Sequence, residues 1–430
     1  MIIDDSKEKN KNEIFIMRIS FIIIIISFFF SVFSNKFEEY DKAVTIKLQK
    51  IVTIYHIFFY ISKLLNNHIF YSFIIIIIDN FTNIYITFLL FIILYIGNYI
   101  SFILKLGIKQ KPPYLSNNDN IKIYDCGLGW GLPSTEIIIY VPFIFIFYEM
   151  MNIYKDSINK TLKKIIQICL IIYLLFMCIG NIVIGKNYLS QIFISFLFGI
   201  GISLFIASLN INLKNGSILY SILTKSFLYL IVNIILIIIA FVIYIYNINS
   251  SPNKIEKMLC KPTQQNNNIN YFNEKNGYVL LVNGSFLFLS IFIVNIFLYI
   301  SLKMYLVYIL ENDLNYFIQF NFNDSKTDLN KSTFSISIDK DTKWNKTSII
   351  KTIIRLFISL ILYVICFLPY YFIKWNENIF IVFSLKFCLS NILFYIGYFF
   401  VSKIFYIKFH LINYTLFAQI EKGYDTILLN

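Results

Sequence analysis

Charged residues are scarce in this chain, and their shortage excludes a broad class of proteins. They make up 14% of the 430 residues, whereas a soluble domain carries about 25%. Hydrophobic residues make up 58%. A chain so poor in charge cannot cover a soluble surface, so a soluble globular protein is excluded.

Histidine and arginine are scarcer still. Histidine occurs three times, at His56, His68 and His410, and arginine occurs twice, at Arg18 and Arg355. The formal net charge of +13 therefore comes almost entirely from lysine. Lysine-rich loops beside apolar runs are typical of membrane proteins, and we expect no nucleic-acid partner.

Long apolar runs fill most of the chain and predict its fold class. A helix needs about 20 apolar residues to cross a bilayer, and we count about nine or ten such segments. The predicted fold is all-α, a polytopic integral membrane helical bundle. The predicted spans are residues 14–33, 69–78, 84–106, 133–153, 165–184, 188–209, 218–246, 278–310, 349–373 and 379–405.

Three features qualify this list of spans. The first run has no clear small-residue cleavage site after it, so we predict an uncleaved anchor helix. The run at 69–78 is short and is expected to extend upstream. Residues 51–65 alternate aromatic and polar side chains, which favours an interfacial or tilted helix.

The loops predict the orientation of the chain and its division into parts. Residues 154–164 hold four lysines and one acid beside two helix ends, which favours the cytosolic side. By alternation, residues 107–132 and 180–188 lie on the opposite, lumenal or exterior side. The predicted parts are 1–50, an anchor helix and charged segment; 51–209, a membrane core; and 210–430, further helices with polar loops 247–277 and 311–347.

Three segments carry motif-like residues in a fixed order. They read ILYIGNYISFILKLGIKQKPP at 93–113, GWGLPSTE at 129–136 and GNIVIGKNYLSQIFISFLFGIG at 180–201. In order and spacing they resemble the signatures of the type-2 phosphatidic acid phosphatase superfamily. The likeness points to the sphingoid-base-phosphate and dolichyl-pyrophosphate phosphatase branches, and it makes 51–209 a lipid-phosphatase-like core.

That resemblance implies phosphoryl transfer through a covalent phosphohistidine, and the residues present do not fit it. Glu136 stands where the family has the proton-donating histidine. Asn181 stands at the arginine position and Asn187 at the nucleophilic histidine. Gln191 stands at the orienting acid, where the dolichyl branch also has glutamine. An asparagine amide cannot form the covalent intermediate. We therefore interpret the catalytic motifs as degenerate.

A scaffold for anion binding remains at these segments. Helix-start hydroxyls and nearby lysines are expected to contact phosphate, and these residues are Lys105, Lys109, Lys111, Ser134, Thr135 and Lys186. Lys111–Pro112 matches an Arg–Pro pair of the first motif, which leaves Lys105 one residue out of register. For Glu136 we prefer an acid suited to the helix dipole over a substitute proton donor.

The preferred function is a catalytically degenerate lipid-phosphatase-like protein that binds or presents a phosphorylated lipid, or supports a partner. Its predicted location is an internal membrane such as the endoplasmic reticulum, with the motif loops lumenal. One alternative is a divergent active phosphatase for sphingoid-base phosphate or dolichyl pyrophosphate that uses Glu136. Another is an unrelated multi-span transporter or scramblase. Membrane lipids are the expected partners, and the sequence indicates no protein partner.

Two structural expectations follow. Lys111, Ser134 and Asn187 should meet in one polar pocket at one end of the bundle, with loop 154–164 at the other. Arg355 and Lys386 should face the bundle interior or extend to the membrane surface, because charge is costly in lipid.

The six cysteines show no paired-ligand spacing, so we expect no metal site and no cofactor. Four of them lie in apolar runs and are interpreted as inert packing residues: Cys169, Cys178, Cys366 and Cys388. Cys126 and Cys260 lie in loops predicted on the same side of the membrane. They either form a disulfide, which requires Cα atoms within about 7 Å, or stay unpaired.

Overall fold

The computed structural model describes most of the chain. The described residues are 2–51, 68–81, 84–115, 120–124, 130–153, 160–209, 226–250, 257–259, 278–280, 296–297, 299–301, 304, 349–372, 382–409 and 411. The predictions for residues 51–65, for loop 311–347, for most of span 278–310, and for Cys126 and Cys260 lie outside them.

The described part is a bundle of α-helices, which confirms the predicted fold class. The α-helices are α1 (Ile2–Phe33), α2 (Glu38–Ile51), α4 (His68–Phe81), α5 (Ile84–Ile108), α6 (Thr135–Ile153), α7 (Lys160–Val183), α8 (Leu189–Leu209), α10 (Ser226–Ser250), α12 (Ile349–Phe372), α14 (Ser390–Tyr395) and α15 (Lys403–Lys408). Short 3-10 turns are η1 (Ser34–Phe37) and η2 (Pro113–Leu115). π-Helical stretches are η5 (Val382–Leu389) and η6 (Ile396–Ser402).

Six helices within the described residues are long and apolar enough to cross a membrane. They cover Ile14–Phe33, Leu90–Leu115, Lys163–Val183, Leu189–Ser208, Tyr229–Asn247 and Ile350–Tyr370. Two shorter apolar helices cover Tyr71–Asn80 and Thr135–Tyr148. The chain is therefore an integral membrane protein, with apolar side chains facing outward on most of these helices.

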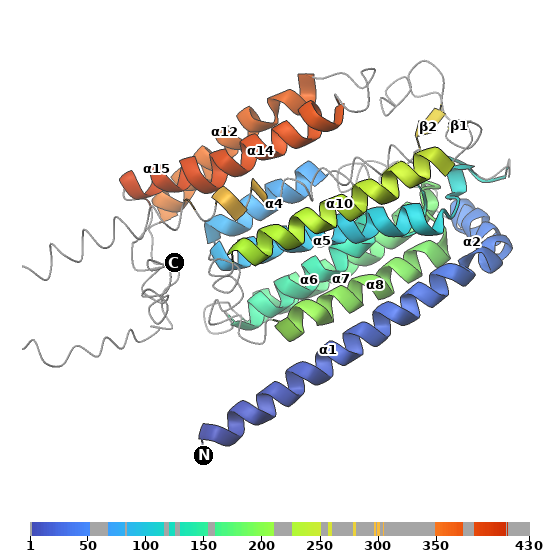
Figure 1. Ribbon diagram of the computed structural model, residues 1–430, viewed down its shortest axis with the longest axis horizontal. Helices are drawn as coiled ribbons and strands as arrows, with labels where there is room; N and C mark the ends of the chain where they lie inside the picture. Colours follow the sequence, from blue (N-terminus) through green and yellow to red (C-terminus); the bar gives the residue numbers. More distant parts are fainter. Residues whose placement is uncertain are drawn as a thin grey trace, which may run out of the picture.

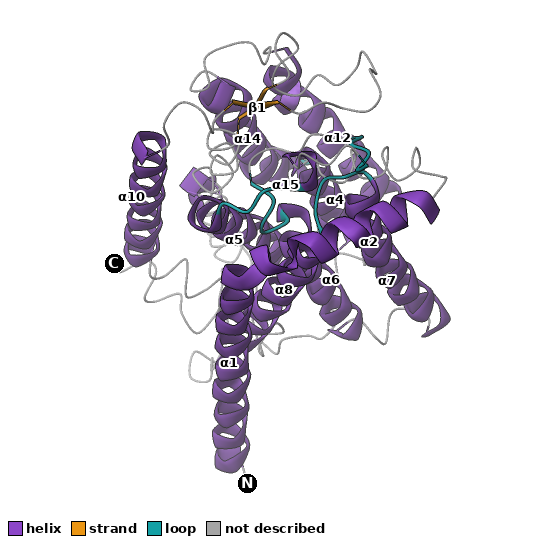
Figure 2. Cartoon of the chain, turned by 90° about the vertical axis from the view of Figure 1, so that its right-hand side faces the viewer, coloured by secondary structure: helices purple, strands orange, loops and turns teal. Residues whose placement is uncertain are grey.

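The helices run alongside one another, with α12, α14 and α15 on one side of the bundle and α1 on the opposite side (Figure 1). α1 packs along α8, α8 against α6, and α6 against α5. α12 packs against α4 and α14. α2 lies across the end of the bundle at which α1 finishes, and the described loops gather beside it (Figure 2). That end carries the motif segments.

Close helix packing depends on glycines that face large side chains. A Cβ at Gly97 of α5 would lie 2.7 Å from the Ile139 side chain of α6. A Cβ at Gly199 of α8 would lie 2.7 Å from Val141 of the same helix α6. Small residues let the backbones of membrane helices approach closely. α6 is therefore packed closely between α5 and α8.

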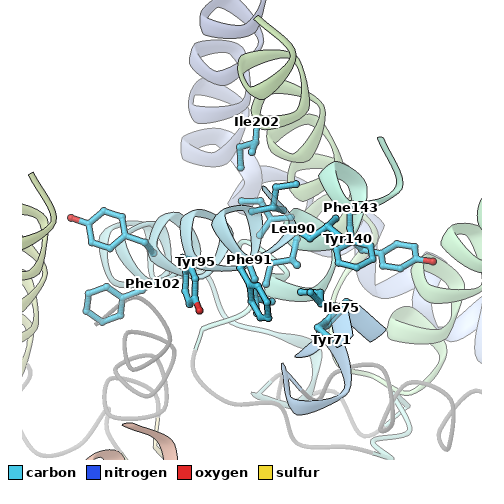
Figure 3. Packing of buried hydrophobic residues seen from close by; sticks show 14 of the residues in the cluster. Tyr71, Ile75, Leu90, Phe91, Tyr95, Phe102, Tyr140, Phe143 and Ile202 are labelled. Atoms are coloured by element: carbon cyan, nitrogen blue, oxygen red, sulfur yellow. The ribbon is translucent and has the colours of Figure 1, made fainter. Parts of the chain in front are cut away.

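Aromatic side chains fill the core around α5 (Figure 3). Phe91 and Tyr95 are fully buried, and both contact Tyr395 of α14 in edge-to-face geometry. Phe143 of α6 packs on Tyr71 of α4 in the same way. The core thus joins α5 to helices from both halves of the chain.

Arg355 ties the last helices to α4. Its guanidinium is fully buried and donates to the carbonyls of Leu411 (2.9 Å) and Asn80 (3.2 Å). Asp79, the neighbour of Asn80, accepts a hydrogen bond from the Tyr398 hydroxyl, and its charge acts on Arg355. Arg355 therefore faces the bundle interior, as predicted. The Lys386 side chain is outside the described part.

Several helices in the N-terminal half extend beyond the predicted segments. The predicted span 14–33 is confirmed, but the helix α1 that contains it begins at Ile2, because residues 2–13 contain no proline or glycine to stop the helix. The charged segment 35–50 forms η1 and the helix α2, whose first turn carries acids that suit its dipole. α7 begins at Lys160, inside the predicted loop 154–164, because lysine is a good helix former.

The predicted loop 247–277 also differs from the structure. α10 continues to Ser250. Asn247 is accommodated in this helix because its side-chain Nδ2 donates to the Ile243 carbonyl at 2.8 Å. Strand β1 (Lys257–Leu259) follows and pairs antiparallel with β2 (Tyr278–Leu280). Tyr, Val and Leu suit a strand, so β2 replaces the predicted helical start of 278–310. The other described helices begin and end within a few residues of the predicted positions.

Candidate functional site

The three motif segments meet at one end of the bundle. The Gln191 side-chain amide of α8 donates to the Lys111 carbonyl (3.0 Å), and Asn187 donates to the Gly131 carbonyl (2.8 Å). The backbone N–H of Ser134 donates to Ser195 Oγ (2.7 Å). These bonds join the end of α5, the start of α6 and the start of α8, as predicted.

The predicted lysine-rich end of α7 lies far from this site. α7 has 24 residues between Lys160 and Val183, and a helix of that length spans about 36 Å. Val183 adjoins the motif turn, so Lys160, Lys163 and Lys164 lie near the opposite end of the helix. The arrangement agrees with the predicted separation of the two faces.

A tight turn between α7 and α8 presents Lys186 to the site. Gly185 has a left-handed φ of 78°, and an added Cβ there would lie 2.9 Å from the Lys122 carbonyl. The backbone N–H groups of Lys186 and Asn187 both donate to the Asn181 carbonyl, at 2.9 and 3.1 Å. This is the usual way to end a helix at a glycine, and it turns the chain back over α6.

Glu136 lies at the centre of the polar cluster. Its Oε1 accepts from Lys186 Nζ at 2.7 Å, and its Oε2 accepts from Ser134 Oγ at 2.8 Å. Lys105 Nζ, on α5, donates to the Trp130 carbonyl. The charges that act on Lys105 are those of Glu136 and Lys186, so the three side chains form one electrostatic unit. We call Lys105, Ser134, Glu136 and Lys186 the charged cluster.

The charged cluster is almost closed to solvent. Glu136 is 9% exposed and Lys105 is 5% exposed. The side chains of Lys186 and Glu136 are 12% and 11% exposed. Burial away from bulk water strengthens such an ion pair and makes the loss of either partner costly.

The remaining predicted site residues surround the cluster in different ways. The Thr135 hydroxyl shares a hydrogen bond with Ser101 of α5 (2.7 Å). Lys109 directly follows α5, has a left-handed φ of 54° and is half-buried. Lys111 is exposed, and its carbonyl accepts from Gln191. Asn181 is fully buried behind the turn. Of the predicted site residues, the structure thus brings Lys105, Ser134, Glu136 and Lys186 into the charged cluster, and Lys111 contributes its backbone carbonyl to Gln191.

Helix α2 supplies residues that sequence reasoning missed. Asp41 is buried and accepts from both the backbone N–H (3.0 Å) and the hydroxyl of Ser190, at the start of α8. Gln49 bonds both backbone groups of Lys122 and the Val183 carbonyl, at 2.6 to 2.9 Å. No local pattern predicts these long-range contacts. They fix the turn and the start of α8 against α2.

Three buried polar atoms around the cluster have no hydrogen-bond partner among the described residues: Gln110 Oε1, Trp130 Nε1 and Asn187 Oδ1. Each of these residues lies in one of the three motif segments, which the hydrogen bonds described above join together. Buried polar atoms in native proteins are normally paired with protein, water or a bound molecule. The site therefore has hydrogen-bonding capacity beyond its own bonds.

Comparison with known proteins agrees with this arrangement. The model of the PAP2 superfamily matches residues 85–214, which include α5, α6, α7, α8 and all three motif segments. No curated protein and no solved structure matches the chain. The resemblance to the type-2 phosphatidic acid phosphatase superfamily is confirmed for that region.

Asp41 should give the stability of the chain a distinct pH dependence. Burial raises the pKa of the Asp41 carboxyl above its ordinary value, although the bonds from Ser190 lower it in part. A raised pKa favours folding while the acid is protonated, and this contribution is lost as pH rises from about 4 through the raised pKa. The melting temperature of the detergent-solubilised chain, minus that of Asp41→Asn, should therefore fall as pH rises. Glu39→Gln, which changes an exposed acid on the same helix, is the matched control. A flat difference for Asp41→Asn would contradict this account.

Proposed function

Because residues 85–214 match the PAP2 superfamily, we propose that this chain is a catalytically degenerate lipid-phosphatase-like membrane protein that binds or presents a phosphorylated lipid. The observation that carries the proposal is the charged cluster. It lies where the family's catalytic motifs meet, yet Glu136 and Asn187 replace the two histidines that the chemistry needs.

These residues do not support hydrolysis by the family mechanism. The Asn187 amide is not a nucleophile at neutral pH, and it donates to the Gly131 carbonyl. Glu136 is paired with Lys186, and an adjacent ammonium favours the ionised carboxylate, which has no proton to give to a leaving group. Both halves of the expected acid–base and nucleophilic chemistry are therefore missing at their positions.

The same cluster supports binding of an anion. Lys105 and Lys186 bring two positive charges to the one negative charge of Glu136, and the start of α6 adds its dipole. A phosphate group that enters from the membrane surface would balance the excess charge. The acyl chains of the lipid that carries this phosphate would remain among the apolar faces of the surrounding helices. A lipid phosphate monoester has both the negative charge that the cluster needs and the apolar chains that these helix faces accommodate.

The orientation and location are part of the proposal. Lysines at the start of α7 favour the cytosolic side for that end of the bundle, which assigns the charged cluster to the lumenal side. We infer an internal membrane such as the endoplasmic reticulum, where phosphorylated lipids are available to a lumenal site.

The purified chain should release no phosphate from phosphatidic acid, a sphingoid-base phosphate or dolichyl pyrophosphate. The reason is the absence of histidine at both catalytic positions. Released phosphate is measured against a mock preparation, with an active lipid phosphatase in the same detergent as the positive control. Turnover that disappears in Glu136→Gln would instead establish a divergent enzyme.

The chain should nevertheless recognise the phosphate head group. Short-chain phosphatidic acid should raise its melting temperature in detergent more than short-chain phosphatidylcholine does, because only the former offers an exposed phosphate monoester. Lys186→Met should lose this difference. Lys408→Met, which removes an exposed lysine on α15, should keep it. Equal responses to the two lipids in the unmodified chain would contradict lipid-phosphate binding.

A further inference from the structure

The Glu136 carboxylate is held by groups of the kind that hold a phosphate. It accepts from the Lys186 ammonium at 2.7 Å and from the Ser134 hydroxyl at 2.8 Å, at the start of α6. An ammonium and a hydroxyl at a helix start are typical donors to phosphate oxygens. The carboxylate therefore has the donor set of a bound anion.

Glu136 also interacts with both lysines that the proposed function assigns to the ligand. Lys186 contacts it directly, and the charge of Lys105 acts on it from α5. Only 9% of Glu136 is exposed, so its charge is balanced by these groups rather than by bulk water. A second anion at Lys186 would lie against a like charge, which is unfavourable.

We infer that Glu136 is an internal occupant of the anion site, which an incoming lipid phosphate must displace to reach Lys186 and Ser134. This inference rests on the proposed function and adds its regulation. The carboxylate keeps the cluster intact when no lipid is bound, and it weakens the binding of the lipid that replaces it. Such a site exchanges its ligand readily, which suits presentation of a lipid rather than storage.

Removal of Glu136 should have opposite effects on the stability of the fold and on the binding of phosphate. Removal of Glu136 leaves Lys186 buried without its partner, which destabilises the fold. An external anion can take the place of the carboxylate. The Glu136→Ala chain should therefore be both less stable and better at binding phosphate than the unmodified chain.

The test measures thermal unfolding of the full chain in non-ionic detergent while inorganic phosphate is raised at constant ionic strength. Glu136→Ala should start from a lower melting temperature and recover it as phosphate increases. Its apparent affinity for phosphate should exceed that of the unmodified chain by about tenfold or more, because a tenfold change corresponds to the loss of one modest competing interaction. Glu136→Gln, which keeps the side-chain volume, should show the same direction.

The control variant is Arg355→Ala, which also removes a fully buried charge, at a place away from the charged cluster where the acid Asp79 acts on it. Phosphate stabilises folded proteins in general, and Arg355→Ala reports that effect alone. If phosphate raises the melting temperatures of Glu136→Ala and Glu136→Gln no more than that of Arg355→Ala, the inference is overturned. Should Glu136→Ala not fold, the result for Glu136→Gln decides. A preference of the unmodified chain for phosphatidic acid would survive that failure, so the two proposals are distinguishable.

Discussion

The ion pair between Glu136 and Lys186 is the interaction on which the rest of the site depends. The two residues are far apart in sequence, at the start of α6 and in the turn after α7, and their charged atoms lie 2.7 Å apart in a nearly closed environment. Either charge alone would be expensive there, whereas the pair is tolerated. The pair therefore holds the turn that carries Lys186 and Asn187 over the start of α6.

The surrounding fold makes that pairing possible. Gly97 and Gly199 allow α5 and α8 to approach α6 closely, so the ends of these helices reach one another. Asp41 and Gln49 of α2 then fix the start of α8 and the turn from outside the bundle. Polar groups at this end are bonded largely to each other, which stabilises irregular backbone away from bulk water.

The sequence predicted the helices well because the bilayer sets their length. Runs of apolar residues with few charges have few alternatives, and the segments ending at Phe33 and Leu209 end where they were predicted to end. Boundaries next to polar residues were less predictable. Lys160 and Asn247 look like loop residues, yet each lies within a helix, because side-chain polarity does not by itself interrupt backbone hydrogen bonding.

The candidate site was predictable in its membership but not in its bonds. The order of the motifs along the chain predicted that Ser134 and Asn187 would meet, since the family's spacing encodes their proximity. For the acid at Glu136 the sequence suggested a helix dipole or a substitute proton donor, and not an ion pair, because its partner Lys186 belongs to another segment. Asp41 lay in a segment that looked merely charged, and its contact with Ser190 depends on how α2 crosses the bundle.

A double-mutant cycle tests the central claim most directly, namely that Glu136 and Lys186 act as one buried pair at the meeting point of the motifs. Glu136→Gln, Lys186→Met and the double variant are compared with the unmodified chain by their free energies of unfolding in detergent. The account predicts a favourable coupling energy of about 1.5–3 kcal/mol, typical of charge-assisted bonds. Additivity within about 0.5 kcal/mol would show that the pair does not hold the site together, and would contradict the account.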